Sequence, residues 1–597
     1  MKKQLTRNEV DKNYQWDLTK IYENDELWEK DYEKVKEEMK KITSFQGNFT
    51  KSAQNLYEFL VFENKLDRKM SKLYYYAHLK HDEDTTNPVY QTLYGKIDDL
   101  MNEYSVLSSF TSPEMLTINY DVVKKYMEEE PRLKEYEFNL ENFYRFENHI
   151  LSTELEELMN HFSSSLSAPE EIYESLTDSD MKFGNIKVDE EEIELTESNY
   201  SKYIKSYDRK IRKEAFTRIF ETYGNLKNTI AKTFKGNVDV LTSMAKVKKY
   251  DSSLQASLYR DHIDPKVYHN LIDTVHKRMD TIYHYFDMKK DILKLDELHL
   301  YDIYTPLVQN TQKEYSFEEA KDIVIKALSP LGENYIHDLQ KAFDEKWIDV
   351  YNNVGKRGGA YSSGFYDTNP YVLLNFEGTL NDVSTLAHEL GHSMHTYYSC
   401  KNNPYQYSSY KIFVAEVAST VNELLLNHYL LNHCEDKNEK LFILNNLMEL
   451  YKSTIYRQVM FAEFERDMHK KKENGEVLTA ELLCNEYYEL NKKYFGDSVV
   501  IDDLIKYEWE RIPHFYYDFY VYKYAIGLSS ACHIVNNILN HKENALENYL
   551  KFLSLGGSDY PANELLVAGV DVTKSDFIES AIDMFEKTIE EFYTLVK

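Results

Sequence analysis

Apolar residues recur at helical spacing over long stretches of the chain. An example begins near Asp25, where the apolar stripe consists of Leu27, Val35, Met39 and Ile42. Apolar positions three and four residues apart are typical of an amphipathic helix that packs one face against a core. The pattern predicts successive amphipathic helices over residues 16–180, and again from about residue 199 to about residue 331.

Two short β-branched segments interrupt this helical pattern. Residues 186–188 and 193–195 flank an acidic turn. Two such runs joined by a short polar turn predict a β-hairpin. We expect a domain boundary close to this hairpin, with a helical N-terminal lobe over residues 1–190 and a catalytic domain over residues 191–597.

The pattern changes again before a long predicted helix. Four of the 18 glycines lie within residues 355–364, and the strand-like run 371–376 follows them. Helix resumes with Asn381 or Asp382 as the expected N-cap. A glycine-rich approach, a strand and then a helix is a common way to form the floor of a functional site.

The composition favours a mainly helical fold. Glycine and proline together number 18 + 11 = 29 of 597 residues, which is about 5% where average usage gives roughly 12%. A many-stranded sandwich or barrel needs more turn residues than this chain has. We therefore expect mostly long helices.

The net charge and the length of the apolar runs limit the kinds of partner that the protein can have. The formal net charge is 71 − 101 = −30, which disfavours a nucleic-acid partner because phosphate backbones are repelled. No run approaches 18 apolar residues, so no membrane span is predicted. The first residues, MKKQLTRNEV, lack the apolar segment of a secretion signal, and none of the four cysteines forms a C-x-x-C pair. We expect a cytoplasmic protein.

The predicted helix after residue 381 contains the pattern H-E-x-x-H at His388, Glu389 and His392. Histidines four residues apart stand on one helix face, so both imidazoles can reach a single Zn²⁺. Glu389 projects beside the metal, where it can take a proton from water. An apolar stripe on the same helix predicts that it is buried, and it consists of Val383, Leu386, Ala387, Leu390 and Met394.

A catalytic zinc needs a third protein ligand and an open position. Glu416 lies 24 residues beyond His392, within the apolar part of a helix predicted over residues 411–431, and is a candidate for that ligand or for a buried ion pair. Glu423 lies seven residues further along nearly the same face and could orient a ligand or make a structural hydrogen bond. For His395 we favour a core position over a role beside the site.

The segment 507–524, YEWERIPHFYYDFYVYKY, holds six tyrosines around His514. A helix after Pro513 would place Tyr517, Tyr520 and Tyr524 on one face. Phenolic hydroxyl groups can donate to a developing oxyanion, and His514 can do the same or bind a substrate carbonyl. A tyrosine-rich packing face is the alternative interpretation.

These motifs resemble the thimet oligopeptidase family of zinc peptidases, in the form of its bacterial oligoendopeptidase F branch. The resemblance rests on HELGHSMH and on YKIFVAEVAST with Glu423, and extends from residues 13–22 to residues 556–561. It implies an elongated, two-lobed helical zincin-type fold with a deep central channel and a small β-sheet at the cleft.

The resemblance also implies one Zn²⁺ per chain. Its metal ligands correspond to His388, His392 and Glu416, and its general base to Glu389. His514, Tyr517 and Tyr524 correspond to its groups that stabilise the tetrahedral intermediate, and Tyr520 is assigned to substrate binding.

The function we expect is that of a zinc metalloendopeptidase that hydrolyses internal bonds of short oligopeptides. The run 371–376, with Tyr371 and Leu373, would form an edge strand that pairs with an extended peptide. Two alternatives are a metallocarboxypeptidase, which peptides blocked at both ends would distinguish, and a non-enzymatic peptide-binding protein with a structural zinc closed by four ligands. Cleavage preference and oligomeric state, monomer or homo-oligomer, stay open.

Overall fold

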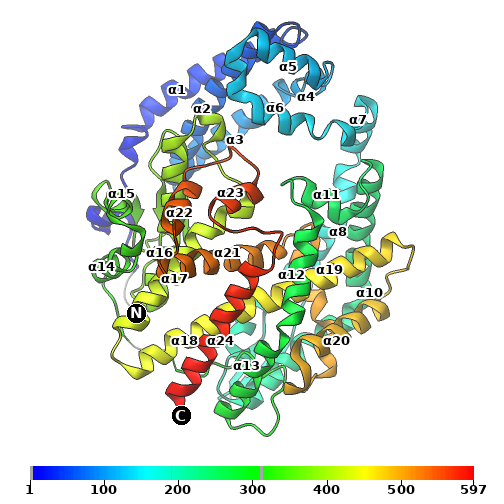
Figure 1. The fold of residues 1–597 in the computed structure, drawn as a ribbon, viewed down its shortest axis with the longest axis vertical. Coiled ribbons are helices and arrows are strands. Elements are labelled where there is room, and N and C mark those ends of the chain that lie inside the picture. The colour runs from blue at the N-terminus through cyan, green and yellow to red at the C-terminus, as the bar shows by residue number, and fades with distance from the viewer. Residues whose placement is uncertain (1–3, 190, 310–312) are drawn as a thin grey trace. The chain divides into compact units, whose positions relative to one another are not determined.

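The computed structural model describes residues 4–189, 191–309 and 313–597. Helices make up most of this described chain, and its strands form two small sheets (Figure 1). The prediction of a mainly α fold is therefore confirmed. The scarcity of glycine and proline explains it, since few residues interrupt the helical pattern.

Contacts divide the chain into two compact units, each assembled from three segments. The first unit contains the described residues of 1–150, 313–429 and 537–569, and the second contains those of 151–312, 430–536 and 570–597. The division expected at residue 190, between an N-terminal lobe and a catalytic domain, stays a prediction.

The first unit is built mainly from helices, and two of them carry the candidate metal ligands. They are α1 (Asp25–Met39), α2 (Ala53–Glu83), α3 (Pro88–Leu107), α4 (Thr111–Met115), α5 (Tyr120–Glu129), α6 (Glu137–Tyr144), α14 (Phe317–Ala327), α15 (Glu333–Asp344), α16 (Leu380–Asn402), α17 (Ile412–His433, ending a few residues beyond the unit), α22 (Ala545–Leu553) and α23 (Pro561–Val567).

The second unit is also built from helices. They are α7 (Thr153–His161), α8 (Ser163–Glu174), α9 (Glu197–Ile204), α10 (Arg209–Val247), α11 (Ser253–Tyr259), α12 (Pro265–Lys277), α13 (Met279–Leu293), α18 (Lys437–Tyr451), α19 (Arg457–Glu473), α20 (Ala480–Phe495), α21 (Tyr522–Leu539, of which the last turn lies beyond the unit) and α24 (Asp576–Val596). Two 3₁₀ helices precede α21, namely η12 (Asp503–Arg511) and η13 (Pro513–Tyr516).

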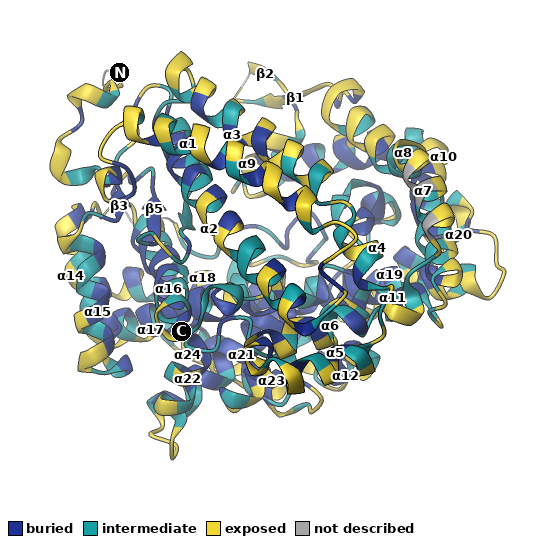
Figure 2. Ribbon diagram, turned by 90° about the horizontal axis from the view of Figure 1, so that it is seen from above, coloured by how far each residue is buried: buried dark blue, intermediate teal, exposed yellow. Residues whose placement is uncertain are grey.

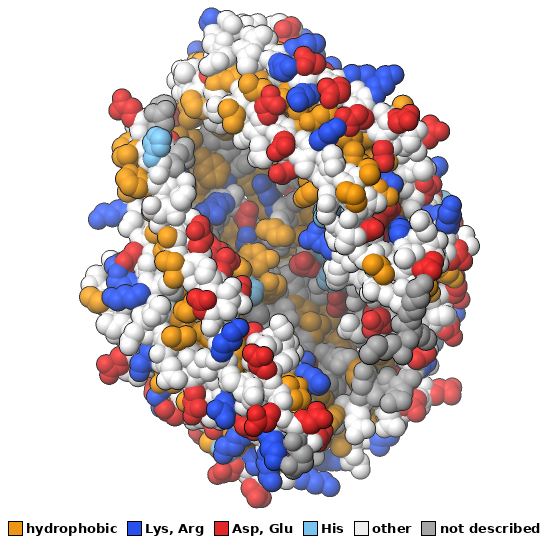
Figure 3. Space-filling view, turned by 180° about the vertical axis from the view of Figure 1, so that it is seen from behind, with side chains coloured by type: hydrophobic (Ala, Val, Ile, Leu, Met, Phe, Trp, Pro, Cys, Tyr) orange, Lys and Arg blue, Asp and Glu red, His pale blue; other side chains and the backbone are white. Residues whose placement is uncertain are grey.

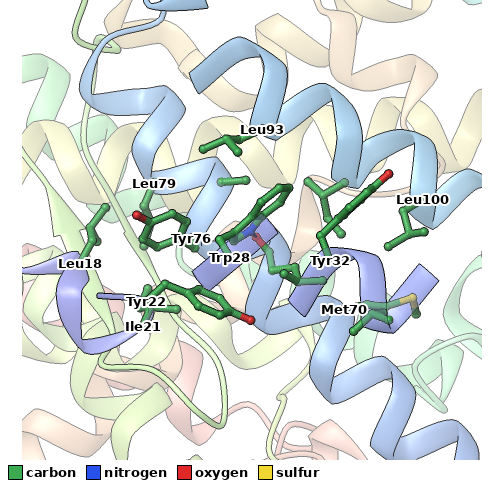
Figure 4. Packing of buried hydrophobic residues seen from close by; sticks show 14 of the residues in the cluster. Leu18, Ile21, Tyr22, Trp28, Tyr32, Met70, Tyr76, Leu79, Leu93 and Leu100 are labelled. Atoms are coloured by element: carbon green, nitrogen blue, oxygen red, sulfur yellow. Dashed lines mark hydrogen bonds between the residues drawn. The ribbon is translucent and has the colours of Figure 1, made fainter. Parts of the chain in front are cut away.

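Packing in the first unit follows the predicted amphipathic pattern, with one exception in α1. In α1 the buried residues are Trp28, Tyr32, Val35 and Met39, whereas Leu27, which the sequence placed on the stripe, is 41% exposed. Val35 and Met39 are thus buried as the stripe predicted, and only Leu27 is replaced on the buried face, by Trp28. The two aromatic rings of this face belong to Trp28 and Tyr32. They stack at 5.3 Å and join a core cluster from α1, α2 and α3 (Figure 4), and Figure 2 shows exposed residues on the other side of α1.

The larger sheet has three strands in the order β3-β5-β4, formed by β3 (Ile348–Asp349), β4 (Tyr361–Ser363) and β5 (Tyr371–Leu373). β5 pairs in parallel with β3 and antiparallel with β4. The strand predicted within 371–376 is thus present as β5, but the prediction that it lies at the edge of the sheet is wrong. β5 is the central strand, and the side chains of Tyr371 and Leu373 are fully buried, so neither contacts a peptide added to the sheet.

The predicted hairpin is present in the second unit. β1 (Asn185–Val188) pairs antiparallel with β2 (Glu191–Glu194), with Ile186 opposite Ile193. Ile186 is buried. The two β-branched runs on either side of the acidic turn therefore predicted this element correctly.

Charged side chains cover much of the surface. Acidic and basic groups lie interspersed over the face drawn in Figure 3. Among the residues that the structure describes, no helix is long and apolar enough to cross a membrane.

Candidate metal centre

The start of α16 sets the position of the two histidines. Thr379 is the N-cap, and its side chain accepts a hydrogen bond from the backbone N–H of Asp382, whose carboxylate accepts one from the Thr379 N–H at 2.8 Å in return. This capping box replaces the expected N-cap at Asn381 or Asp382. The helix then carries His388 and His392 one turn apart, with ring centroids separated by 4.9 Å.

The predicted burial of α16 is confirmed along its whole apolar stripe. Val383, Leu386, Ala387, Leu390 and Met394 are each 0% exposed. The stripe therefore fixes the rotation of the helix about its axis, and with it the direction of both imidazoles.

A glycine allows α16 and α17 to approach closely. A Cβ atom on Gly391 would lie 2.5 Å from the Cα of Ser419 and 2.7 Å from the carbonyl oxygen of Ala418. The side-chain amide of Asn422 on α17 also donates to the carbonyl of Ala387 on α16, at 3.0 Å. The two helices are therefore held backbone to backbone beside the histidines.

This approach brings Glu416 of α17 to both imidazoles. Its Oε2 atom lies 3.5 Å from Nε2 of His388 and 3.4 Å from Nε2 of His392. Ligands about 2.1 Å from one ion in a tetrahedral arrangement lie roughly 3.4 Å apart. The three donor atoms, all within 4.8 Å of one another, can hold a metal ion, and two nitrogens with one carboxylate oxygen suit zinc.

Carboxylates set the protonation of this cluster. The Glu416 side chain is 49% exposed, so its desolvation is partial. This desolvation raises its pKa, but hydrogen bonding and charge from His392, followed by His388 and Ser419, lower it to about 2. Burial lowers the pKa of His388, but the hydrogen bond and charge of Glu423, with Glu389 and Glu416, raise it overall. The cluster has an excess of negative charge that favours a bound cation.

Glu423 contacts the other nitrogen of His388. Its Oε1 atom accepts a hydrogen bond from Nδ1 of His388. A carboxylate on Nδ1 fixes the imidazole tautomer and leaves Nε2 free to bind a metal. Of the two roles considered for Glu423, the geometry favours orientation of a ligand.

Glu389 lies on the same helix, and its side chain is shielded from solvent. The residue is 6% exposed, and burial raises the pKa of its carboxyl group, although charge from His388 and His392 and a hydrogen bond from the Ser362 N–H oppose this shift. Ser362 belongs to β4, so the sheet positions the carboxyl group. A carboxylate with a raised pKa accepts a proton more readily than one in water.

Sequence reasoning missed two supporting serines. Ser419 donates to Oε2 of Glu416 at 3.0 Å, and Ser393 links the carbonyl of Glu389 to the hydroxyl of Ser362. The spacing of Ser419, three residues after Glu416, was a signal that the sequence offered. The contact from Ser362 had none, because it depends on how the sheet packs against α16.

His395 occupies the core, as we expected. It is 1% exposed, its ring stacks on Tyr410 with centroids 3.6 Å apart, and burial lowers its pKa to about 3. A neutral imidazole inside an aromatic stack contributes packing.

The aromatic segment lies in the second unit, where it does not form the single helix that we predicted. η13 ends at Tyr516, and α21 starts at Tyr522 after a turn. The turn contains residues in left-handed conformation, which a continuous helix excludes.

Three tyrosine rings nevertheless surround His514. Its ring centroid lies 5.6 Å from that of Tyr517, 6.3 Å from Tyr520 and 6.0 Å from Tyr524. The Tyr524 hydroxyl lies 3.4 Å from Nε2 of His514, and burial lowers the pKa of the imidazole, which is therefore neutral at pH 7. His514 and the three tyrosines thus gather hydrogen-bonding groups around one imidazole.

A histidine pair and a carboxylate that could hold a metal ion, with a shielded glutamate beside them, are the groups that a metallopeptidase site requires. Comparisons with known proteins agree, since the sequence profile of Peptidase family M3 matches residues 202–584 and that of Oligopeptidase F matches residues 114–183. The chain belongs to peptidase family M3 and is a metallopeptidase.

Relatives match over nearly the full chain. Oligopeptidase PepF of Bacillus subtilis is 43% identical over 591 residues, covering 99% of this chain and 88% of that protein. Group B oligopeptidase PepB of Streptococcus agalactiae is 39% identical and covers 99% of this chain and 98% of that protein.

Two solved structures are similar. A crystal structure of oligoendopeptidase-F from Enterococcus faecium has a TM-score of 0.73 at 34% identity, with 96% of this chain and 99% of that chain covered. A structure from Chlamydophila abortus has a TM-score of 0.95 at 38% identity, with 99% and 100% covered.

Proposed function

We propose that this chain is a zinc-dependent endopeptidase that cleaves internal bonds of short oligopeptides. The observation that carries the proposal is the cluster of His388, His392 and Glu416 beside the shielded carboxyl group of Glu389. The names of the relatives, oligopeptidase PepF and oligoendopeptidase F, support the choice of substrate.

Zinc is the metal that the donor set suits best. Imidazole nitrogens and one carboxylate, with a free coordination position, are the ligands of many catalytic zinc sites. When bound, zinc polarises the scissile carbonyl and lowers the pKa of water. His388 and His392 would hold it through Nε2 and Glu416 through Oε2, while Glu423 keeps the proton of His388 on Nδ1.

Glu389 is proposed as the general base. Its carboxylate takes a proton from the attacking water and delivers it to the departing amine as the peptide bond breaks. The hydrogen bond from the Ser362 N–H keeps the carboxyl group in place while the proton moves. Burial supports the role, because a partly desolvated carboxylate is a stronger base.

His514, Tyr517 and Tyr524 are proposed to donate hydrogen bonds to the oxyanion, with Tyr520 contacting the peptide. The resemblance to the thimet oligopeptidase family supports these roles. So does the gathering of three tyrosine rings around a neutral imidazole within the second unit. Neutral donors can stabilise a charge that exists only in the transition state.

An extended peptide is proposed to pair with the outer edge of β4. The opposite edge, at β3, is covered by the N-terminal segment, since the Val350 N–H donates to the carbonyl of Tyr14 and the Asp17 N–H donates to that of Lys346. β4 is the edge next to Glu389. Pairing there would lay the peptide backbone beside the metal ligands.

A closed structural zinc has less support. Such a site needs four protein ligands, and the cluster among the described residues has three. An open position is what a catalytic zinc requires.

The experiment is cleavage of a short quenched-fluorescent peptide blocked at both ends. We expect an internal cut, loss of activity with a chelator, and recovery on addition of one equivalent of Zn²⁺ per chain. A carboxypeptidase would leave the blocked peptide intact. Full activity in excess chelator would contradict the role of the metal.

A further inference from the structure

The turn before α21 contains two consecutive non-glycine residues in left-handed conformation. Asp518 has φ of 53° and Phe519 has φ of 57°. A bulky residue such as phenylalanine rarely adopts this conformation, and keeps it only where the surrounding structure holds it in place. Strain of this kind concentrates at functional sites, and the turn lies among the tyrosines of the aromatic segment.

Phe519 is the anchor of this turn. The residue is 0% exposed, and its ring packs against His469 at 4.5 Å and Tyr268 at 6.0 Å between centroids. Its backbone N–H donates a hydrogen bond of 2.7 Å to Oε1 of Glu465. Both His469 and Glu465 belong to α19, one helical turn apart.

Glu465 is an unusual hydrogen-bond acceptor. It is 0% exposed, and its Oε2 atom has no hydrogen-bond partner among the residues that the structure describes. Burial raises the pKa of its carboxyl group well above the ordinary value, an effect that the Phe519 N–H opposes and the charge of Asp518 reinforces. Its Oε1 atom therefore serves the backbone of the turn as a fully buried hydrogen-bond acceptor.

Asp518, the other left-handed residue of the turn, is bound by residues of α11 and of its C-terminal end. The Ser257 hydroxyl donates to the carbonyl oxygen of Asp518 at 2.7 Å, and Arg260 pairs with the Asp518 carboxylate at 2.9 Å. Two helices therefore bind consecutive backbone groups of one strained turn. Tyr517 and Tyr520 are the residues directly before and after it.

We propose that Glu465 is a positioning residue for the aromatic segment. By accepting the Phe519 N–H it keeps the turn left-handed, and the turn sets the directions in which Tyr517 and Tyr520 leave the backbone. The proposal rests on the function proposed above for His514 and the tyrosines. Without the acceptor, a buried N–H is left without a partner, and the turn relaxes to a conformation that points these side chains elsewhere.

The same helix provides a matched control. Glu463 is also buried on α19, but its carboxylate binds His276, Lys493 and Tyr494 at 2.7, 2.9 and 2.9 Å. These contacts are made with α12 and α20 and involve no residue of the turn. Removal of either carboxylate disturbs the packing of α19, but only one of them touches the aromatic segment.

The test compares Glu465→Ala, Glu465→Gln and Glu463→Ala in the full-length zinc-loaded protein, with the doubly blocked peptide as substrate. Glu465→Ala should lower kcat about tenfold to a hundredfold, since misplacement by about 1 Å has effects of this size, with KM and zinc content nearly unchanged. Glu465→Gln keeps the acceptor oxygen and should stay within about threefold of the original protein, as should Glu463→Ala.

Near-normal kcat for Glu465→Ala would overturn the proposal, as would equal losses in all three variants, which would indicate general packing. If Glu465→Ala does not fold, Ser257→Ala replaces it, because it frees the adjacent carbonyl of the turn, and the same criterion applies with an expected loss of about threefold to tenfold.

Failure of the proposed function gives a different result. If Tyr517→Phe and Tyr524→Phe keep near-normal kcat while Glu465→Ala loses it, the oxyanion roles proposed for these two tyrosines are wrong, whereas the turn still positions a group that the reaction needs. If the tyrosine variants lose kcat and Glu465→Ala does not, the positioning role is wrong and the function stands.

Discussion

Glu423 contacts one candidate metal ligand, His388, without belonging to the candidate ligand set itself. Its carboxylate holds Nδ1 of His388 and so presents Nε2 to the metal. Loss of such a partner typically weakens metal binding by a factor of about 10–100. We therefore expect Glu423→Ala to raise the dissociation constant of zinc by about this factor, as measured by competition with a chromogenic chelator.

The control for this change is Glu435→Ala, at an exposed position just beyond α17. It should leave zinc affinity unchanged. Equal zinc affinity in the Glu423→Ala and original proteins would mean that the contact with His388 is structural only.

The two tyrosines assigned to the oxyanion give a kinetic prediction. Tyr517→Phe and Tyr524→Phe each remove one hydroxyl group, so kcat should fall by about 10²–10³ with KM nearly unchanged, because the lost hydrogen bond strengthens only in the transition state. Zinc content should stay at one per chain. Steady-state kinetics on the blocked peptide measure both parameters.

Tyr207→Phe is a suitable comparison, since the Tyr207 side chain is exposed in the second unit. It should have no effect. A change below about threefold in both Tyr517→Phe and Tyr524→Phe would leave these residues as a packing face.

At the scale of elements, the close packing of α16 against α17 depends on Gly391. In Gly391→Ala the new Cβ meets the backbone of Ser419 at 2.5 Å, so the helices must move apart and carry Glu416 away from the imidazoles. Overpacking of this kind destabilises a fold by about 1–3 kcal/mol. We expect both a lower melting temperature and weaker zinc binding.

Gly95→Ala is the matched change, in the middle of α3 with nothing within 4 Å of the new Cβ. It should be neutral or stabilising by up to about 1 kcal/mol, because alanine is the better helix former. Zinc affinity in Gly391→Ala equal to that of the original protein would contradict the account of helix spacing.

Local pattern predicted α16 and α17 because their apolar stripes recur at helical spacing and are buried as expected. It missed the start of α16, since Thr379 and Asp382 cap the helix as a pair. It also missed the centre of the sheet, because strand order depends on pairing with segments far along the chain. The break at Asp518 and Phe519 was hidden for a similar reason, since neither residue signals a left-handed turn without the support of Glu465 and Ser257.

The sequence predicts more of the candidate metal site than of the fold around it. The spacing of His388 and His392, and the isolation of Glu416 among apolar residues, were enough to select three residues whose donor atoms the structure brings together. The roles of Tyr371 and Leu373 could not be predicted correctly, because a strand-like run in the sequence carries no sign of whether it lies at an edge.

For the whole molecule, substrate length is the property that the resemblance most strongly implies. We expect turnover of short peptides, which would lie extended along one strand edge, and none of a folded protein, whose backbone is already paired. Digestion of peptides of graded length, followed by mass spectrometry, measures the limit. Rapid cleavage of a stably folded protein would contradict the proposed restriction to short peptides.

The central claim is that His388, His392 and Glu416 hold the catalytic zinc while Glu389 moves the proton. The most direct measurement is kcat for Glu389→Gln on the doubly blocked peptide, together with bound zinc per chain. We predict a loss of kcat of at least about 10²–10⁴-fold, the usual contribution of a general base, with one zinc retained, whereas Glu416→Ala should lose the metal. Near-normal kcat in Glu389→Gln, or loss of its zinc, would contradict the account.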